Sequence, residues 1–189
     1  MKTTFIRAIF IAALFICQLA SAQQNNRTIF LVRHAEPASA APVASLSASG
    51  EKRAQCLAQT LADSGIKQIY VSDAKRAQQT AAPLAAQLRL KPSEIATKDI
   101  SKTVRNLLYG GTGNTLFIGD GDMLPLIVQR LQAGKVSAIS DSEFDRLFVI
   151  SVAEGSSAPA ATLRYCEGGV TGGGATVKHV SLPTAGRKP

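Results

Sequence analysis

Short apolar runs alternate along the chain with longer stretches in which apolar residues recur every three or four positions. The runs predict strands, because a strand covered on both faces by helices is apolar at successive positions. The predicted strands are 28–32, 68–71, 114–118, 146–152 and 161–167. The longer stretches predict helices at 50–64 (with Ser47 or Ser49 as N-cap), 75–88, 103–108 and 123–132. Residues 94–100 fit neither pattern.

This order of elements predicts the fold class. Strands that alternate with helices are typical of α/β proteins, in which helices cover both faces of the sheet. We therefore expect a single-domain, three-layer α/β/α fold with a mostly parallel central sheet. The 189 residues suffice for one domain with a substantial core, and they contain no internal repeat. Pro83 lies inside the predicted helix 75–88 and can kink it.

The N-terminus has the layout of a secretory signal, expected at residues 1–22. Lys2 and Arg7 precede a short apolar run, and the small residues Ala20 and Ala22 occupy the cleavage positions. We expect cleavage after Ala22 and a mature protein in the periplasm or outside the cell. An uncleaved anchor is the alternative, but the apolar run is too short for an ordinary membrane span. No stable membrane insertion is expected after cleavage.

The rest of the chain divides into a domain at 23–167 and a tail at 168–189. The tail is rich in glycine and basic residues, and we expect it to be disordered. The signal holds two of the 21 Lys and Arg residues and none of the 13 acids, which leaves a net charge of +6. Such a charge suits anionic ligands. Aromatic residues make up 5% and do not alternate with basic ones, which argues against a nucleic-acid partner.

Two cysteines, Cys56 and Cys166, remain once Cys17 has left with the signal. An exported protein can form a disulfide. On the predicted helix, however, Leu57 and Leu61 share a face from which Cys56 points away, whereas Cys166 is expected on a strand. The pattern argues weakly against pairing and leaves it open. Two lone cysteines offer no metal cluster, and no cofactor is expected.

Residues that could carry chemistry gather where predicted strands end. Strand 28–32 leads directly to Arg33 and His34, and Arg76 lies in the first turn of the helix after strand 68–71. Ligands of open α/β sheets bind at the carboxyl ends of the strands. A histidine there can act as a nucleophile, and arginines can hold an oxyanion. Taken singly, each is as well explained as a solvated surface charge; taken together, they indicate a phosphate clamp around a nucleophile.

Four segments in order, LVRHAE, LSASGEKRAQ, SDAKRAQQTA and TLFIGDGDML, are similar to the histidine phosphatase superfamily, which has the phosphoglycerate-mutase-like fold. The resemblance covers roughly residues 28–167, and the short length resembles the small phosphohistidine-phosphatase-like members. The extra sequence of the glycolytic mutases is not apparent. The resemblance implies a metal-independent reaction in which His34 becomes a phosphohistidine while Arg33 and Arg76 bind the phosphoryl oxygens.

The same resemblance places a second histidine directly after the strand and glycine of TLFIG. Asp120 stands there instead, in the slot of a phosphate-binding histidine. An ionised carboxylate repels phosphate: two like charges about 4 Å apart cost on the order of 4 kcal/mol at an effective dielectric near 20. Alternatively, Asp120 could take up a proton when phosphate arrives and act as a donor or general acid.

Three further residues are weighed against this site. Asp122 is expected to cap the following helix rather than to act in catalysis. Asp99 lies in the interval where many members of the family carry an acid that protonates the leaving group, although nothing in its surroundings marks it. His179 is the other histidine of the mature chain, but it lies in the predicted tail and is not expected to replace the missing one.

These observations predict an exported phosphomonoesterase of histidine-phosphatase type, with His34 as nucleophile and with reduced activity. Its partner would be a phosphorylated small molecule or a phosphoprotein. The alternative is an inactive family member that binds a phosphorylated or anionic ligand through Arg33 and Arg76. A smaller alternative is an unrelated binding role, for example at an anionic cell surface.

Overall fold

The computed structural model describes residues 26–97, 99–153, 156–166 and 180–181. The expected signal and most of the predicted tail lie outside these residues. Within them, no helix combines the length and the apolar character that a membrane span requires.

The strands form one sheet in the order β3-β2-β4-β1-β5-β7-β8, and β6 pairs with β5. Their bounds are Arg27–Arg33 (β1), Ile66–Ser72 (β2), Ser93–Ile95 (β3), Asn114–Gly119 (β4), Arg146–Ala153 (β5), Ser156–Ser157 (β6), Ala161–Arg164 (β7) and Val180–Ser181 (β8). Strands β1 to β4 pair in parallel, whereas β5 to β8 join antiparallel. The parallel part is the part in which helices connect the strands.

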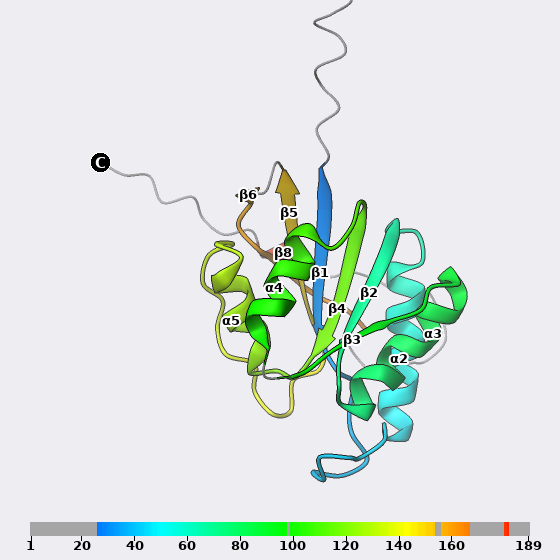
Figure 1. The fold of residues 1–189 in the computed structure, drawn as a ribbon. Coiled ribbons are helices and arrows are strands. Elements are labelled where there is room, and N and C mark those ends of the chain that lie inside the picture. Colours follow the sequence, from blue (N-terminus) through cyan, green and yellow to red (C-terminus); the bar gives the residue numbers. More distant parts are fainter. Residues whose placement is uncertain (1–25, 98, 154–155, 167–179, 182–189) are drawn as a thin grey trace, which may run out of the picture.

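Four helices complete the layers (Figure 1): α2 (Ala48–Leu61), α3 (Lys75–Leu88), α4 (Ile100–Tyr109) and α5 (Met123–Arg130). Strand β1 shows how the layers form, because its side chains alternate between the two faces. Ile29 and Leu31 pack with α4 and α5, whereas Phe30 and Val32 pack with α2 and α3. The predicted three-layer α/β/α fold is therefore confirmed.

Most element boundaries agree with the sequence pattern. Helix α3 runs over the predicted residues and continues through Pro83. The unassigned interval 94–100 contains the end of β3 and the start of α4. Strand β7 ends at Arg164, earlier than predicted, because Cys166 adopts a positive φ of 57°. In the predicted tail, the structure describes Val180–Ser181, which pair with β7.

The weak argument against pairing of the two cysteines, which had left the question open, was wrong. A disulfide joins Cys56 of α2 to Cys166 just beyond β7, with the two Cα atoms 6.3 Å apart. The helical pattern identified only the face of α2 that packs on the sheet. The end of β7 also reaches α2, where Tyr165 and Cys166 pack in the same cluster as Leu57. Cys56 is consequently buried on a second face of the helix.

Candidate active site

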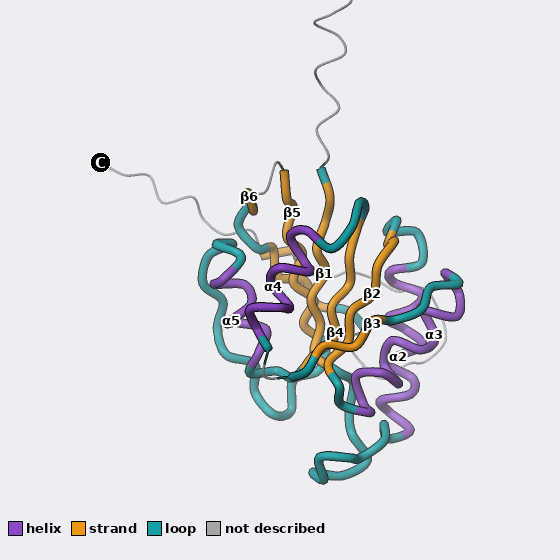
Figure 2. Tube along the Cα trace, viewed as in Figure 1, coloured by secondary structure: helices purple, strands orange, loops and turns teal. Residues whose placement is uncertain are grey.

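The four predicted site residues come together at the carboxyl ends of three parallel strands. Arg33 ends β1 and His34 follows it, Arg76 lies in the first turn of α3 after β2, and Asp120 follows β4. Because β4 lies between β1 and β2 in the sheet, these three strand ends are neighbours. The loop that follows β1 and the last part of the loop between α5 and β5 lie at the same edge of the sheet (Figure 2).

The imidazole of His34 is fixed in orientation. His34 is 3% exposed, and its Nδ1 lies 2.8 Å from the carbonyl oxygen of Ala35. Since a carbonyl oxygen only accepts, Nδ1 must donate, and Nε2 is left to face the other side chains of the site. Thr80 supports this arrangement, because its hydroxyl accepts from the backbone N–H of Ala35 and donates to the carbonyl of Arg76. The end of β1 is thereby joined to the start of α3.

Asp120 lies between Arg76 and His34. Its Oδ1 is 2.6 Å from Arg76 Nη2 and 3.4 Å from His34 Nε2. The pKa of Asp120 falls to about 2, because contact with the His34 ring and then with the Arg76 guanidinium favours the charged form, while burial opposes it. Of these two contacts, the one with Arg76 is a short hydrogen bond, whereas the one with His34 is longer than an ordinary hydrogen bond. Asp120 is therefore an ionised carboxylate at neutral pH.

Arg33 is held in a different way. Its Nη1 donates to the carbonyl oxygens of Ser140, Asp141 and Glu143 at 2.8, 3.1 and 3.2 Å. Its guanidinium also stacks on the Phe144 ring, 4.3 Å from the ring centre. Burial lowers the pKa of Arg33, and neighbouring carboxylates oppose this, but an arginine stays charged.

A glycine lets the turn after β4 approach Arg33. A Cβ added at Gly121 would lie 3.1 Å from Arg33 Cδ and 3.2 Å from Nε, which is too close for ordinary contact. The Gly-Asp-Gly turn at residues 119–121 therefore combines two roles. Asp120 contributes a carboxylate to the site, and Gly121 leaves room for the arginine beside it.

The four residues line a cleft of about 850 Å³. Its walls are the loop after β1 and the segment 139–144, which includes Phe144. Asp122 and Asp141 also line it, and both are exposed. Within the described part of the chain, their carboxylates accept no hydrogen bond and form no ion pair. The described residues contain no group of three or more His, Cys, Asp or Glu that could hold a metal ion.

The other candidates have structural explanations or fall elsewhere. Asp99 caps α4, because its side chain accepts from the N–H of Lys102 at 2.8 Å, and it does not line the cleft. Asp122 occupies the N-cap position of α5 as predicted, but its side chain makes no capping bond. Its backbone is helical, with φ −73° and ψ −26°, instead of extended as in most N-caps. His179 lies outside the described residues.

The segment 139–144 was not predicted to take part. It belongs to a stretch between α5 and β5 without regular secondary structure, so no periodicity marks it. Its contacts with Arg33 use backbone carbonyls, which every sequence provides. The aromatic Phe144 among polar residues was the one available signal, and it was too weak to identify a stacking partner.

Comparison with known proteins agrees with this geometry. The family model of the histidine phosphatase superfamily (branch 1) matches residues 29–98, which include Arg33, His34 and Arg76. A search of curated proteins finds no match.

Solved structures with a similar fold include the alpha-ribazole phosphatase from Shigella flexneri, with 17% identity and a TM-score of 0.57 over 70% of this chain and 94% of that one. They also include the protein histidine phosphatase SixA complexed with tungstate, with 20% identity and a TM-score of 0.56 over 69% of this chain and 92% of that one. The resemblance of this chain to the histidine phosphatase superfamily is thus confirmed, in sequence over residues 29–98 and in fold over about 70% of its length.

Proposed function

We propose that this protein is a phosphomonoesterase of histidine-phosphatase type, in which His34 is the nucleophile and Asp120 reduces the activity. The observation that carries the proposal is the orientation of the His34 ring. Its Nδ1 is fixed by the Ala35 carbonyl, and its Nε2 faces a charged cleft that Arg33 and Arg76 also line. A buried imidazole that directs one nitrogen into a cleft at the carboxyl ends of parallel strands is suited to attack a bound electrophile.

The reaction would proceed in two displacements. The lone pair of His34 Nε2 forms a bond to phosphorus while the ester P–O bond breaks, and the leaving oxygen takes up a proton from solvent, which the attacking water returns in the second step. Water then attacks the phosphohistidine, phosphate leaves, and Nε2 regains its lone pair. Arg33 and Arg76 would bind the phosphoryl oxygens and stabilise the charge that spreads over them in each transition state.

Asp120 opposes the first step in two ways. Its carboxylate already pairs with the Arg76 guanidinium and contacts His34 Nε2, so an incoming phosphoryl group must displace it. It also adds a negative charge next to a dianionic substrate. With a pKa of about 2, the alternative role of Asp120 as a protonated donor requires a bound phosphate that raises this pKa by several units.

The pairing of Asp120 with Arg76 favours a second candidate function. On this view the protein is an inactive member of the family that binds an anionic ligand. Asp120 acts as an internal anion at Arg76, whereas Arg33 makes no ion pair among the residues that the structure describes. A ligand could therefore be held chiefly by Arg33 without reacting with His34.

We also propose that the protein is exported and acts on a phosphorylated small molecule or a phosphoprotein. The signal-like N-terminus supports export, and so does the disulfide, since such bonds persist mainly in oxidising compartments. Two of the structural neighbours are named for an alpha-ribazole phosphatase and a protein histidine phosphatase, so both substrate classes stay open. Intact-mass analysis of exported protein tests the first point, and the expected N-terminus is Gln23.

Trapping the phosphoenzyme tests the enzymatic proposal. The full-length protein is mixed with an aryl phosphate and analysed by mass spectrometry at neutral to alkaline pH, where phosphohistidine survives. We expect label on His34 and none in His34→Ala. Absence of both turnover and label, in the wild type and in Asp120→His, would replace the enzyme by the binding candidate. Tungstate binding that depends on Arg33 would then support that second function.

A further inference from the structure

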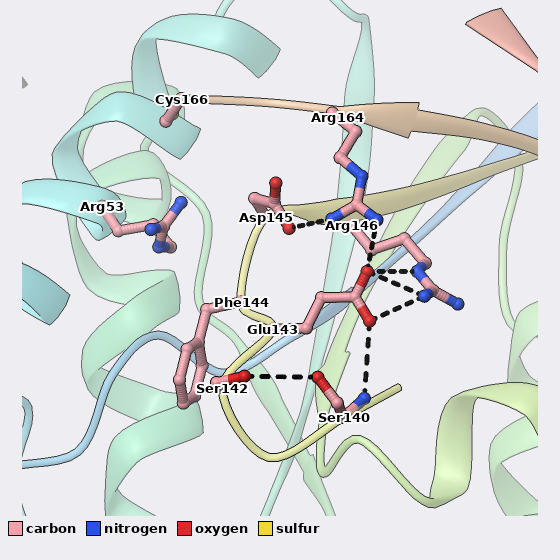
Figure 3. A pocket seen from close by; sticks show the side chains of 9 residues that line it. All are labelled: Arg53, Ser140, Ser142, Glu143, Phe144, Asp145, Arg146, Arg164 and Cys166. Carbon is pink, nitrogen blue, oxygen red and sulfur yellow. Dashed lines mark hydrogen bonds and ion pairs between the residues drawn. The ribbon is translucent and has the colours of Figure 1, made fainter. Parts of the chain in front are cut away.

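A second polar cleft of about 620 Å³ lies along the segment 140–146 (Figure 3). Phe144 lines both clefts, so the segment separates them. The second cleft contains a compact cluster of Glu143, Asp145, Arg146 and Arg164. Its carboxylates and arginines point toward one another (Figure 3), which leaves little free charge for a ligand.

Glu143 is the centre of this cluster. Its carboxylate accepts two short hydrogen bonds from Arg146 Nη2, at 2.6 and 2.7 Å, and pairs with Arg164 Nη2 at 2.5 Å. The Ser140 backbone N–H also points to this carboxylate, at 3.4 Å, while the Glu143 N–H donates to the Ser140 carbonyl at 3.0 Å. Glu143 therefore closes the turn 140–143 and attaches it to β5 and β7.

The same turn provides the carbonyls that hold Arg33. Ser140, Asp141 and Glu143 all accept from Arg33 Nη1. Carbonyl dipoles orient a guanidinium without cancelling its charge, whereas a carboxylate such as Asp120 beside Arg76 largely neutralises it. Arg33 is thus both fixed in place and left with its charge available to a ligand.

We propose that Glu143 is a positioning residue for Arg33. Glu143 closes the turn 140–143, and the carbonyls of this turn then direct the Arg33 guanidinium toward a ligand in the active-site cleft. This role depends on the proposed function, in which Arg33 binds the oxyanion of the ligand. Tyr165 assists from the same side, because its hydroxyl donates to the Phe144 carbonyl at 3.1 Å and its N–H donates to the Asp145 carbonyl at 2.9 Å.

A double-mutant cycle with a matched control tests the role of Glu143. Glu143→Gln removes the charge that binds Arg146 and Arg164. Asp145→Asn is the control, because it makes the same change in charge in the same segment, but its side chain bonds to Arg164 and not to the turn. We expect Glu143→Gln to weaken tungstate binding about tenfold and Asp145→Asn less than about twofold. In the Arg33→Ala background, Glu143→Gln should add no further loss.

Equal losses from Glu143→Gln in both backgrounds would overturn the proposal, because they would show an effect that does not pass through Arg33. Arg164→Gln guards against a folding failure of Glu143→Gln, since Arg164 is 36% exposed. Arg164→Gln should weaken tungstate binding more than Asp145→Asn does, and this difference should disappear in the Arg33→Ala background. Equal losses from the two variants, or a difference that persists in the Arg33→Ala background, would contradict the proposal.

A readout without ligand separates this proposal from the proposed function. The Nε of Arg33 is buried and has no hydrogen-bond partner among the described residues. Its N–H signal in NMR spectra should exchange slowly with water in the wild type and in Asp145→Asn, and about tenfold faster in Glu143→Gln. If the wild type binds no tungstate, the proposed clamp fails, and this exchange rate still decides the role of Glu143. Unchanged exchange in Glu143→Gln would refute it.

Discussion

The two clefts contain similar side chains but differ in how their charges are compensated. In the second cleft, Glu143 and Asp145 pair with Arg146 and Arg164, and Arg146 is only 7% exposed. In the active-site cleft, Asp120 pairs with Arg76, but Arg33 pairs with no carboxylate within the described residues, and the carboxylates of Asp122 and Asp141 bind no partner there. Paired charges indicate a structural role, whereas charges held apart indicate a site that keeps them for a ligand. Variants in the second cleft should therefore act mainly on stability and reach ligand binding only through Arg33, whereas variants in the active-site cleft should act on ligand binding directly.

The largest expected effect is on stability, from reduction of the Cys56–Cys166 bond next to the second cleft. This bond closes a loop with a sequence separation of 110. Reduction should lower the free energy of unfolding by about 4 kcal/mol, because the unfolded chain regains the freedom that a long closed loop denies it. Denaturant melts with and without dithiothreitol measure this. The Cys56→Ser variant is the control. It should unfold at the same denaturant concentration as the reduced protein, with or without dithiothreitol.

Breaking the buried ion-pair cluster should have the next largest effect. Arg146→Ala should lower the free energy of unfolding by about 3 kcal/mol, since it leaves the Glu143 carboxylate with only one arginine in a largely buried position. Arg164→Ala, at a half-exposed position, should lower it by about 1 kcal/mol. Chemical denaturation compares the two. If the order is reversed, the second cleft does not stabilise the fold as its geometry indicates.

In the active-site cleft, Arg76→Ala should weaken ligand binding. We expect affinity for tungstate to fall by about 2 kcal/mol, the scale of a charged hydrogen bond. The unfolding midpoint should fall as well, because the variant leaves the Asp120 carboxylate without its arginine. The matched control is Lys75→Ala, since Lys75 is the exposed neighbour in the same helical turn and does not line the cleft. Equal losses in titrations of both variants would indicate diffuse surface charge instead of a clamp.

Substitutions of Asp120 test whether its carboxylate reduces activity in the active-site cleft. Asp120→His removes the carboxylate from Arg76 and His34 and introduces a hydrogen-bond donor, so activity on an aryl phosphate should rise about tenfold, or about 1.4 kcal/mol of barrier. Asp120→Asn should recover part of this gain. His34→Ala in the Asp120→His background should abolish it. An Asp120→Asn variant less active than the wild type would support the rival role of Asp120 as a protonatable acid.

The last effect concerns the pH dependence of stability. The folded-state pKa of Asp120, about 2, lies below its unfolded value, so its stabilising contribution is present above that unfolded value and is lost as the pH falls toward 2. The stability difference between the wild type and Asp120→Asn should therefore be constant from pH 7 to about 5 and shift in favour of the variant at lower pH. Urea melts across this range measure it. A difference that is constant down to pH 2 would show that the Arg76–Asp120 contact does not form in solution.

Local pattern was a good guide to the elements of this fold. The bounds of α3 and the strands 28–32 and 114–118 follow from periodicity, which depends on residues close in sequence. The positions of Arg33, His34, Arg76 and Asp120 at strand ends followed from the same pattern. The pattern could not find the segment 139–144, because its role depends on backbone carbonyls in irregular structure.

The sequence by itself determined the α/β class, the order of the layers and the strand ends at which charged side chains collect. Only the tertiary structure decided that Cys56 forms a disulfide with Cys166, that Asp120 pairs with the Arg76 guanidinium, and that Glu143 supports Arg33 through the turn 140–143. The physical reason is separation along the chain. Periodicity fixes which face of an element is buried, but contacts between residues 44 to 110 positions apart depend on strand order and on how the antiparallel strands β5 and β7 return toward α2.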